Sequence, residues 1–185
     1  MMRMQRERSQ LLIVDVQEKV APPVHDAAAM IAVCCRIVQI ATRLGVPITV
    51  SQHYPKGLGV TVEPLRTMLG ADAVVLDKMH FSCMGNKALH HRFDTLRDQS
   101  RGQVVIAGIE AHVCVGQTAL DLLADGYEVY LVADGVSSRS PLSRDLSLTR
   151  IRQAGGYIVD SEMVMFEWLG KAGTPEFKDL IGLIR

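Results

Sequence analysis

Three residues in this chain, Asp15, Lys78 and Cys114, could perform chemistry together, and each follows a short apolar run. A carboxylate, an ammonium group and a thiol can act as a base, an electrostatic stabiliser and a nucleophile. In an open parallel sheet, ligands bind beyond the carboxyl ends of the strands. The spacing therefore predicts that these three side chains meet at one edge of a sheet, although they lie far apart in the sequence.

Each of the three residues also has a simpler interpretation when it is taken alone. Asp15 could be a helix cap or a loop carboxylate, and Lys78 could be a solvated surface lysine. Cys114 could be a small buried hydrophobe, as most free cysteines are. However, helical spacing begins near Cys114 and continues through 119–123, which predicts a thiol in the first helical turn. Free backbone N–H groups and the helix dipole favour negative charge there, so we expect a reactive thiol with a lowered pKa.

Six apolar runs alternate with segments of helical periodicity, and this alternation predicts the fold. We expect a three-layer α/β/α domain over 1–185, with a six-stranded parallel sheet in the Rossmann-like order 3-2-1-4-5-6 and helices on both faces. Asp26 is a candidate cap for the first helix, and Gly108 is expected to end the fourth strand. The predicted strands are 11–14, 47–50, 74–76, 104–107, 127–133 and 157–160.

Composition excludes several classes of protein. The chain has 185 residues, 48% of them apolar, and 20 basic residues balance 20 acidic ones. This neutral balance, without a long charged run, argues against a nucleic-acid or anionic-membrane partner and favours a small-molecule substrate. We see no apolar stretch long enough for a bilayer and no signal peptide in the charged first ten residues.

The four cysteines are expected to be free thiols. Cys34, Cys35, Cys83 and Cys114 form no Cys-x-x-Cys pair and no zinc-type cluster. Without a secretory signal, a reducing cytoplasm is the simplest expectation for the location of the protein.

The order and spacing of these motifs resemble the isochorismatase-like cysteine hydrolases over about residues 10–169. The segments 11–17, 108–115 and Lys78 with Phe81-Ser82 resemble the family's aspartate, nucleophile and lysine motifs. The resemblance implies a catalytic triad of Asp15, Lys78 and Cys114. It also implies a cis peptide between Ile109 and Glu110, with N–H groups near Glu110 and at Cys114 that hold an oxyanion.

The sequence departs from the metal-dependent nicotinamidases of that family. They carry an Asp-x-His motif after the second strand, whereas this chain has Ser51-Gln52-His53-Tyr54. We therefore expect no metal and no other cofactor. The loop 52–59 is closer to the isochorismatase-domain-containing hydrolases. We expect the substrate pocket to include Gln17, His53, Phe81 and His112.

Three functions remain open from the sequence. The first is a cysteine hydrolase that cleaves a C–N bond of a small amide or carbamoyl compound. The second is an isochorismatase-type vinyl ether hydrolase, and the third is a non-catalytic scaffold with the same fold. The resemblance and the apolar stretch 163–168 also indicate a homo-oligomer, although these side chains could instead pack into their own core.

Overall fold

The computed structural model describes residues 3–184 and contains one six-stranded sheet. Its order is β3-β2-β1-β4-β5-β6, and every neighbouring pair is parallel. The predicted architecture and strand order are therefore confirmed. The strands are β1 (Ser9–Val14), β2 (Ile48–His53), β3 (Val74–Lys78), β4 (Gln103–Ile109), β5 (Glu128–Ser137) and β6 (Tyr157–Val159).

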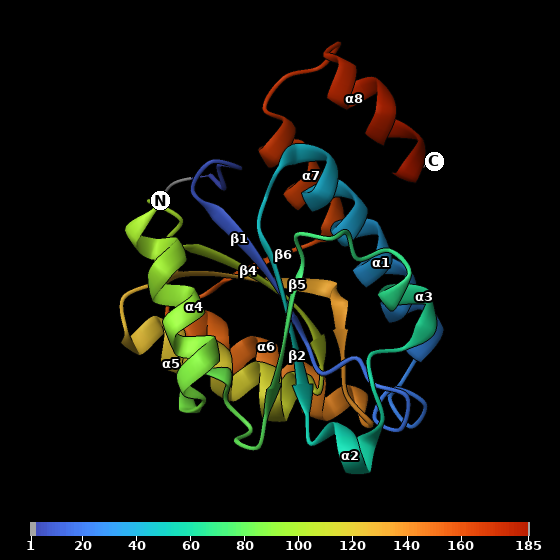
Figure 1. Cartoon of the computed structure of the whole chain (residues 1–185), viewed down its shortest axis with the longest axis vertical. Helices are drawn as coiled ribbons and strands as arrows, with labels where there is room; N and C mark the ends of the chain where they lie inside the picture. Colours follow the sequence, from blue (N-terminus) through green and yellow to red (C-terminus); the bar gives the residue numbers. More distant parts are fainter. Residues whose placement is uncertain (1–2, 185) are drawn as a thin grey trace.

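Helices cover both faces of this sheet. Figure 1 shows α1, α3 and α7 on one side of the sheet and α4, α5 and α6 on the other. The helices are α1 (Ala27–Leu44), α2 (Pro55–Leu58), α3 (Glu63–Arg66), α4 (Lys87–Asp98), α5 (Gly116–Ala124), α6 (Pro141–Gln153), α7 (Ser161–Leu169) and α8 (Pro175–Leu180). Shorter turns are η1 (Cys83–Gly85), η2 (Ala111–Val115) and η3 (Ile181–Ile184).

The strands separate two hydrophobic cores, and β1 shows how. Leu11 and Ile13 pack into the core beneath α1 and α7, whereas Leu12 and Val14 pack into the core beneath α4, α5 and α6. Successive side chains of a strand point to opposite faces, so a strand covered on both faces is apolar throughout. All six residues of β1 are buried. This burial anchors the carboxyl end of β1, where Asp15 follows.

The first helix requires a correction to the sequence analysis. α1 is long and apolar enough to cross a bilayer by length and composition, with 18 residues and a mean hydropathy of 1.6. The expectation that no such stretch exists was therefore wrong. Residues along one side of α1, including Met30, Ile37 and Ala41, are buried against the sheet. The core helix of an α/β fold meets the same criteria without crossing a membrane.

Two other local predictions were wrong in detail. Gly108 does not end the fourth strand, because β4 continues to Ile109. Its φ is 119°, and a Cβ there would lie 2.2 Å from the carbonyl oxygen of Val14, so glycine permits a close approach between β4 and β1. Asp26 does precede α1, but its side chain makes no capping hydrogen bond because its backbone is left-handed, with φ 49°.

The apolar stretch 163–168 is divided between the core and the surface. Val164, Met165 and Trp168 are buried, as the core interpretation expected. Met163 and Phe166 are 50% and 44% exposed, so they form an apolar surface on α7.

Candidate active site

Asp15 lies directly after β1 at the carboxyl edge of the sheet. Its backbone is left-handed, with φ 50°, a conformation that costs a residue other than glycine about 1–3 kcal/mol. The Asp15 N–H donates to the carbonyl of Ser51 at 3.1 Å, and the Ser51 hydroxyl donates to Asp15 Oδ1 at 2.7 Å. These two bonds hold the carboxylate of Asp15 in a fixed direction against the end of β2.

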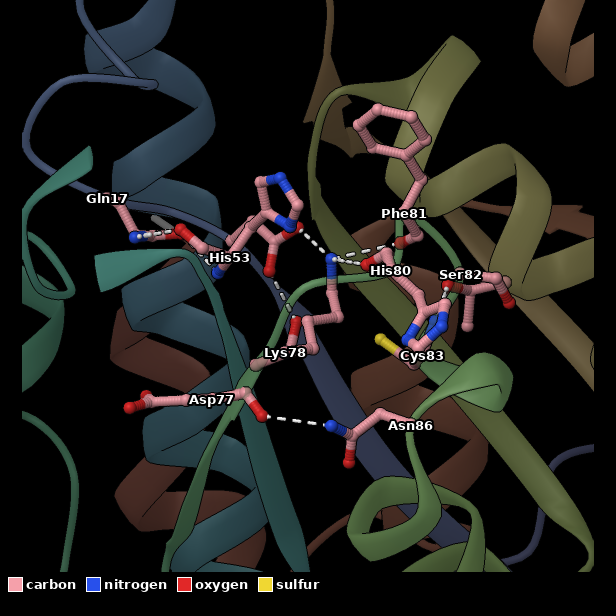
Figure 2. A network of polar contacts seen from close by, with 12 residues as sticks. Gln17, His53, Asp77, Lys78, His80, Phe81, Ser82, Cys83 and Asn86 are labelled. Carbon is pink, nitrogen blue, oxygen red and sulfur yellow. Dashed lines mark hydrogen bonds and ion pairs between the residues drawn. The ribbon is translucent and has the colours of Figure 1, made fainter. Parts of the chain in front are cut away.

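Lys78 reaches Asp15 from the edge of the sheet. It ends β3, and β2 lies between β3 and β1, so the two side chains and the contact between them together bridge two strand spacings, about 10 Å in all. Its Nζ lies 2.6 Å from Asp15 Oδ2, and the side chain is fully buried. The same ammonium donates to the carbonyls of His80 and Phe81 at 3.2 and 2.9 Å, as Figure 2 shows. All three protons of the buried cation therefore have partners.

Cys114 follows β4, which lies on the opposite side of β1 from β2 and β3. It lies in the π-helical turn η2, which continues directly into α5, so it occupies the first helical turn as expected, although that turn is π-helical. The turn is held from behind by Ser147, whose hydroxyl donates to the carbonyl of Ala111 at 2.6 Å. The Cys114 thiol lies near enough to Asp15 and Lys78 for both to affect its pKa, and it lines the same cleft as Asp15.

The pKa of Cys114 is raised, whereas the sequence analysis expected it to be lowered. Burial and the carboxylate of Asp15 raise the pKa of this thiol to about 12, against the lowering effect of Lys78. The residue is only 7% exposed, so desolvation outweighs the effect of the ammonium. The resting residue is therefore a thiol beside a carboxylate.

Lys78 remains charged despite its burial. Burial lowers the pKa of an ammonium group, but Asp15 and the thiols of Cys83 and Cys114 together raise the pKa of Lys78 above its ordinary value. Cys83 is a second buried thiol near the pair, and burial raises its pKa to about 11. Its N–H donates to Thr118 Oγ1 at 2.9 Å.

The backbone between β4 and η2 has a cis peptide bond between Ile109 and Glu110. The Glu110 carboxylate forms an ion pair with Arg139, with 3.0 Å between Glu110 Oε2 and Arg139 Nε. The Arg139 backbone N–H donates to the same oxygen at 3.2 Å. Glu110 therefore positions Arg139 beside the turn η2, which carries Cys114.

A cleft of about 360 Å³ opens onto Asp15 and Cys114. This volume falls in the range of small-molecule sites. Its walls combine apolar side chains with a few charged groups. The lining residues are Asp15, Lys19, Val20, Pro23, His53, Leu58, Phe81, Ile109, Glu110, Val113, Cys114 and Arg139.

The structure divides the four predicted pocket residues into two pairs. His53 and Phe81 line the cleft, and their rings lie 5.5 Å apart, tilted by 36°. Gln17 does not line it, because its buried amide bonds to the backbone of His53 and to the carbonyl of Gly59. His112 lines a different groove between α5 and α6.

Both departures have a physical reason. The Gln17 amide joins the end of β2 to the following loop, so it supports the cleft wall from behind (Figure 2). The His112 ring turns toward the loop after β5, where Nδ1 lies 2.9 Å from Ser138 Oγ. Neither orientation follows from the position of these residues next to a catalytic motif.

His53 has no carboxylate two residues before it, because Ser51 stands there. Burial and the charge of Lys78 lower the pKa of His53, so the imidazole is neutral at pH 7. Within residues 3–184, the one group of histidine and acidic side chains close enough to hold a cation is His90, Asp94 and Asp125, and none of them lines the cleft. Exposed acidic groups commonly gather in this way without an ion.

Sequence reasoning missed Ser51, Lys19 and Arg139. Ser51 has a visible signal, since it is a hydroxyl near the carboxyl end of a buried strand. Lys19 and Arg139 follow β1 and β5 in loops, where the sequence alone does not tell a cleft residue from a solvated one.

Comparison with known proteins identifies the family. The isochorismatase domain model matches residues 9–163. The chain belongs to the isochorismatase family. It is 37% identical over 180 residues to isochorismatase domain-containing protein 2 of Xenopus laevis, covering 96% of this chain and 84% of that protein.

Solved structures agree with this assignment. The MAR1 ribonuclease of Caenorhabditis elegans superposes with a TM-score of 0.92 and 35% identity, over 99% of this chain and 92% of that one. The YcaC protein of Escherichia coli, described as an octameric hydrolase of unknown specificity, shares the fold with a TM-score of 0.89 and 20% identity, over 99% and 91% of the two chains.

Proposed function

We propose that this isochorismatase-family protein is a cysteine hydrolase that cleaves a C–N bond of a small amide or carbamoyl compound. The observation that carries the proposal is the fully buried ion pair of Lys78 and Asp15, next to a cleft that both Asp15 and Cys114 line. Burying an ion pair costs desolvation free energy that the attraction between the charges hardly offsets, so such a pair adds little stability. Its place beside a thiol in a cleft therefore supports a catalytic role.

The proposed reaction begins with a proton transfer. Asp15 accepts the thiol proton of Cys114 as the sulfur attacks the substrate carbonyl, and Lys78 stabilises the negative charge on the sulfur and the carboxylate. Because the resting thiol has a pKa of about 12, the base must act during the attack rather than before it. The raised pKa therefore favours general-base catalysis over a preformed thiolate.

The tetrahedral intermediate places a negative charge on the former carbonyl oxygen. N–H groups of the turn that carries Ile109, Glu110 and Cys114 would stabilise this oxyanion, and one such donor is typically worth about 10²–10³ in rate. Asp15 then gives its proton to the leaving amine as the C–N bond breaks. Water attacks the resulting thioester, Asp15 accepts a proton from it, and the Cys114 thiol is restored as the acid leaves.

The size and charge of the protein support a small-molecule substrate. The cleft of about 360 Å³ and the formal net charge of zero differ from the extended basic surface that nucleic acids require. We also propose a homo-oligomer, supported by the octameric structural neighbour and by the half-exposed Met163 and Phe166 on α7.

A substrate screen with two variants tests the proposal. Purified protein is assayed on small amides, carbamoyl compounds and isochorismate, with Cys114→Ala and Asp15→Asn alongside. We expect amide or carbamoyl hydrolysis that both variants abolish. Isochorismate cleavage that needs Asp15 but survives Cys114→Ala would instead identify a vinyl ether hydrolase, the activity that the family model's name suggests. A folded protein with no activity on any of them would favour the scaffold.

A further inference from the structure

The charged residues of the cleft do not balance once Lys78, which is buried and does not line the cleft, is counted as the partner of Asp15. Two carboxylates lie in its walls, and each has a cationic partner: Asp15 is paired with Lys78, and Glu110 with Arg139. Lys19 is a third cation, besides Lys78 and Arg139. Its Nζ donates to the carbonyl of Gly57 at 3.1 Å, and no carboxylate of residues 3–184 lies within ion-pair distance of it. The cleft and the buried Lys78 together therefore have one more positive than negative charge.

The backbone of Lys19 is fixed beside the cleft. Its N–H donates to the carbonyl of Leu58 at 3.1 Å, and the N–H of Glu18 donates to the carbonyl of Val60 at 3.0 Å. The loop after β1 is thereby joined to the segment that supplies Leu58 to the cleft wall. These bonds limit where the Lys19 ammonium can go, although the side chain itself is exposed.

Arg139 adds unused donors from the loop between β5 and α6. Glu110 accepts from its Nε and from its backbone N–H, which leaves the two terminal nitrogens of the guanidinium without a recorded partner among residues 3–184. The side chain is 64% exposed, so these nitrogens are accessible. Two such N–H groups match the two oxygens of a carboxylate.

The remaining walls are mostly apolar, with Val20, Pro23, Leu58, Phe81 and Val113 among them. His53 adds no charge, since it is neutral at pH 7. From this distribution, and resting on the proposed hydrolase function, we propose that the cleft selects a small amide that carries a negatively charged group, which Lys19 and Arg139 bind while an apolar portion contacts the walls. The simplest such group is a carboxylate.

The charge preference can be measured without the natural substrate, because two alkylating reagents differ mainly in charge. Iodoacetate is anionic and iodoacetamide is neutral. With either one, the Cys114 sulfur forms a C–S bond as iodide leaves, and the thiol proton passes to Asp15 or to water. Peptide mass spectrometry measures the rate at Cys114 separately from Cys34, Cys35 and Cys83. The uncharged thiol N-acetylcysteine methyl ester gives the reference ratio.

We expect the ratio of iodoacetate to iodoacetamide rates at Cys114 to exceed the reference by at least about five-fold, the effect of two opposite unit charges about 4 Å apart in water. The preference should fall as salt is added. Lys19→Met should reduce it. Arg139→Gln should reduce it further, because it also leaves the Glu110 carboxylate without its partner. Lys56→Met is the matched control, since Lys56 is exposed and does not line the cleft.

The outcomes separate this inference from the proposed function. A labelled Cys114 with no preference for the anion, or with a preference that Lys19→Met and Arg139→Gln leave unchanged, overturns the inference while the hydrolase proposal stands. No reaction at Cys114 with either reagent contradicts both. As a second readout, an amide that carries a carboxylate and its methyl ester are compared as substrates. We expect the Lys19→Met variant to raise KM for the acid at least about five-fold, with a smaller change in kcat and little effect on the ester.

Discussion

The buried pair of Lys78 and Asp15 can be tested by removing one partner. Lys78→Met keeps the apolar stem and removes the ammonium, which leaves the Asp15 carboxylate buried with the Ser51 hydroxyl as a remaining side-chain donor. Breaking a buried ion pair in this way typically costs about 3–5 kcal/mol. We therefore expect urea denaturation to show a loss of that size in the free energy of unfolding, with an unchanged m-value.

A double-mutant cycle isolates the interaction. Asp15→Asn combined with Lys78→Met removes both charges, so the double variant should be more stable than the sum of the single losses predicts, by about 2–3 kcal/mol. If Lys78→Met costs less than about 1 kcal/mol and the two changes are additive, the pair does not hold the site together and our reasoning about Lys78 is wrong.

The pH dependence of the free energy of unfolding tests the same ion pair independently. Asp15 and the two thiols raise the pKa of Lys78, so above pH 10.5 the folded protein keeps a proton that the unfolded chain loses. Its contribution to stability is complete below pH 10.5 and is lost as pH rises through the folded pKa. The wild type should therefore lose more stability than Lys78→Met above pH 10.5. Equal losses would contradict the assigned pKa direction.

Four further predictions follow from particular contacts. Ser51→Ala removes a hydrogen bond to a buried carboxylate and should cost about 1.5–3 kcal/mol in urea unfolding, whereas Ser143→Ala, at a half-buried position on α6, should cost much less. Gly108→Ala should cost more than about 3 kcal/mol, because its Cβ would lie 2.2 Å from the Val14 carbonyl oxygen; a neutral effect in thermal unfolding would refute that close approach. Lys78→Met should raise the pKa of His53 in an NMR titration, since the ammonium lowers it, and an unchanged value would show that burial alone is responsible. Light scattering should give a multiple of 20.3 kDa that Phe166→Glu reduces, and a wild-type monomer at micromolar concentration would exclude the oligomer.

The sequence predicts the positions of the chemical groups well because strand ends are easy to locate. Asp15 follows a buried apolar strand, Lys78 ends the half-exposed edge strand β3, and parallel strands bring their carboxyl ends together. That reasoning needs only the period of the apolar residues. It predicts a parallel sheet and the shared edge, and the structure confirms that every neighbouring pair of strands is parallel.

The conformation and electrostatics of the site could not be predicted in the same way. The left-handed backbone of Asp15 and the π-helical turn that carries Cys114 depend on contacts with Ser51 and Ser147, which come from distant segments. The direction of the Cys114 pKa shift depends on a balance of burial against Lys78, and the depth of burial is a tertiary property. The prediction that Gln17 lines the pocket was wrong for a similar reason. Its amide donates to backbone carbonyls at the end of β2 and in the following loop, whose position the sequence does not predict.

The most direct test of the account is to look for the covalent intermediate on Cys114. The protein is mixed with an amide that it hydrolyses, quenched in acid during turnover and examined by intact-protein and peptide mass spectrometry. We predict an added mass equal to the acyl group, located on Cys114 and absent from the Cys114→Ala variant, which should also lose hydrolysis. Hydrolysis that continues at the wild-type rate in Cys114→Ala, with no adduct on the wild-type protein, would contradict the central claim that Cys114 is the nucleophile.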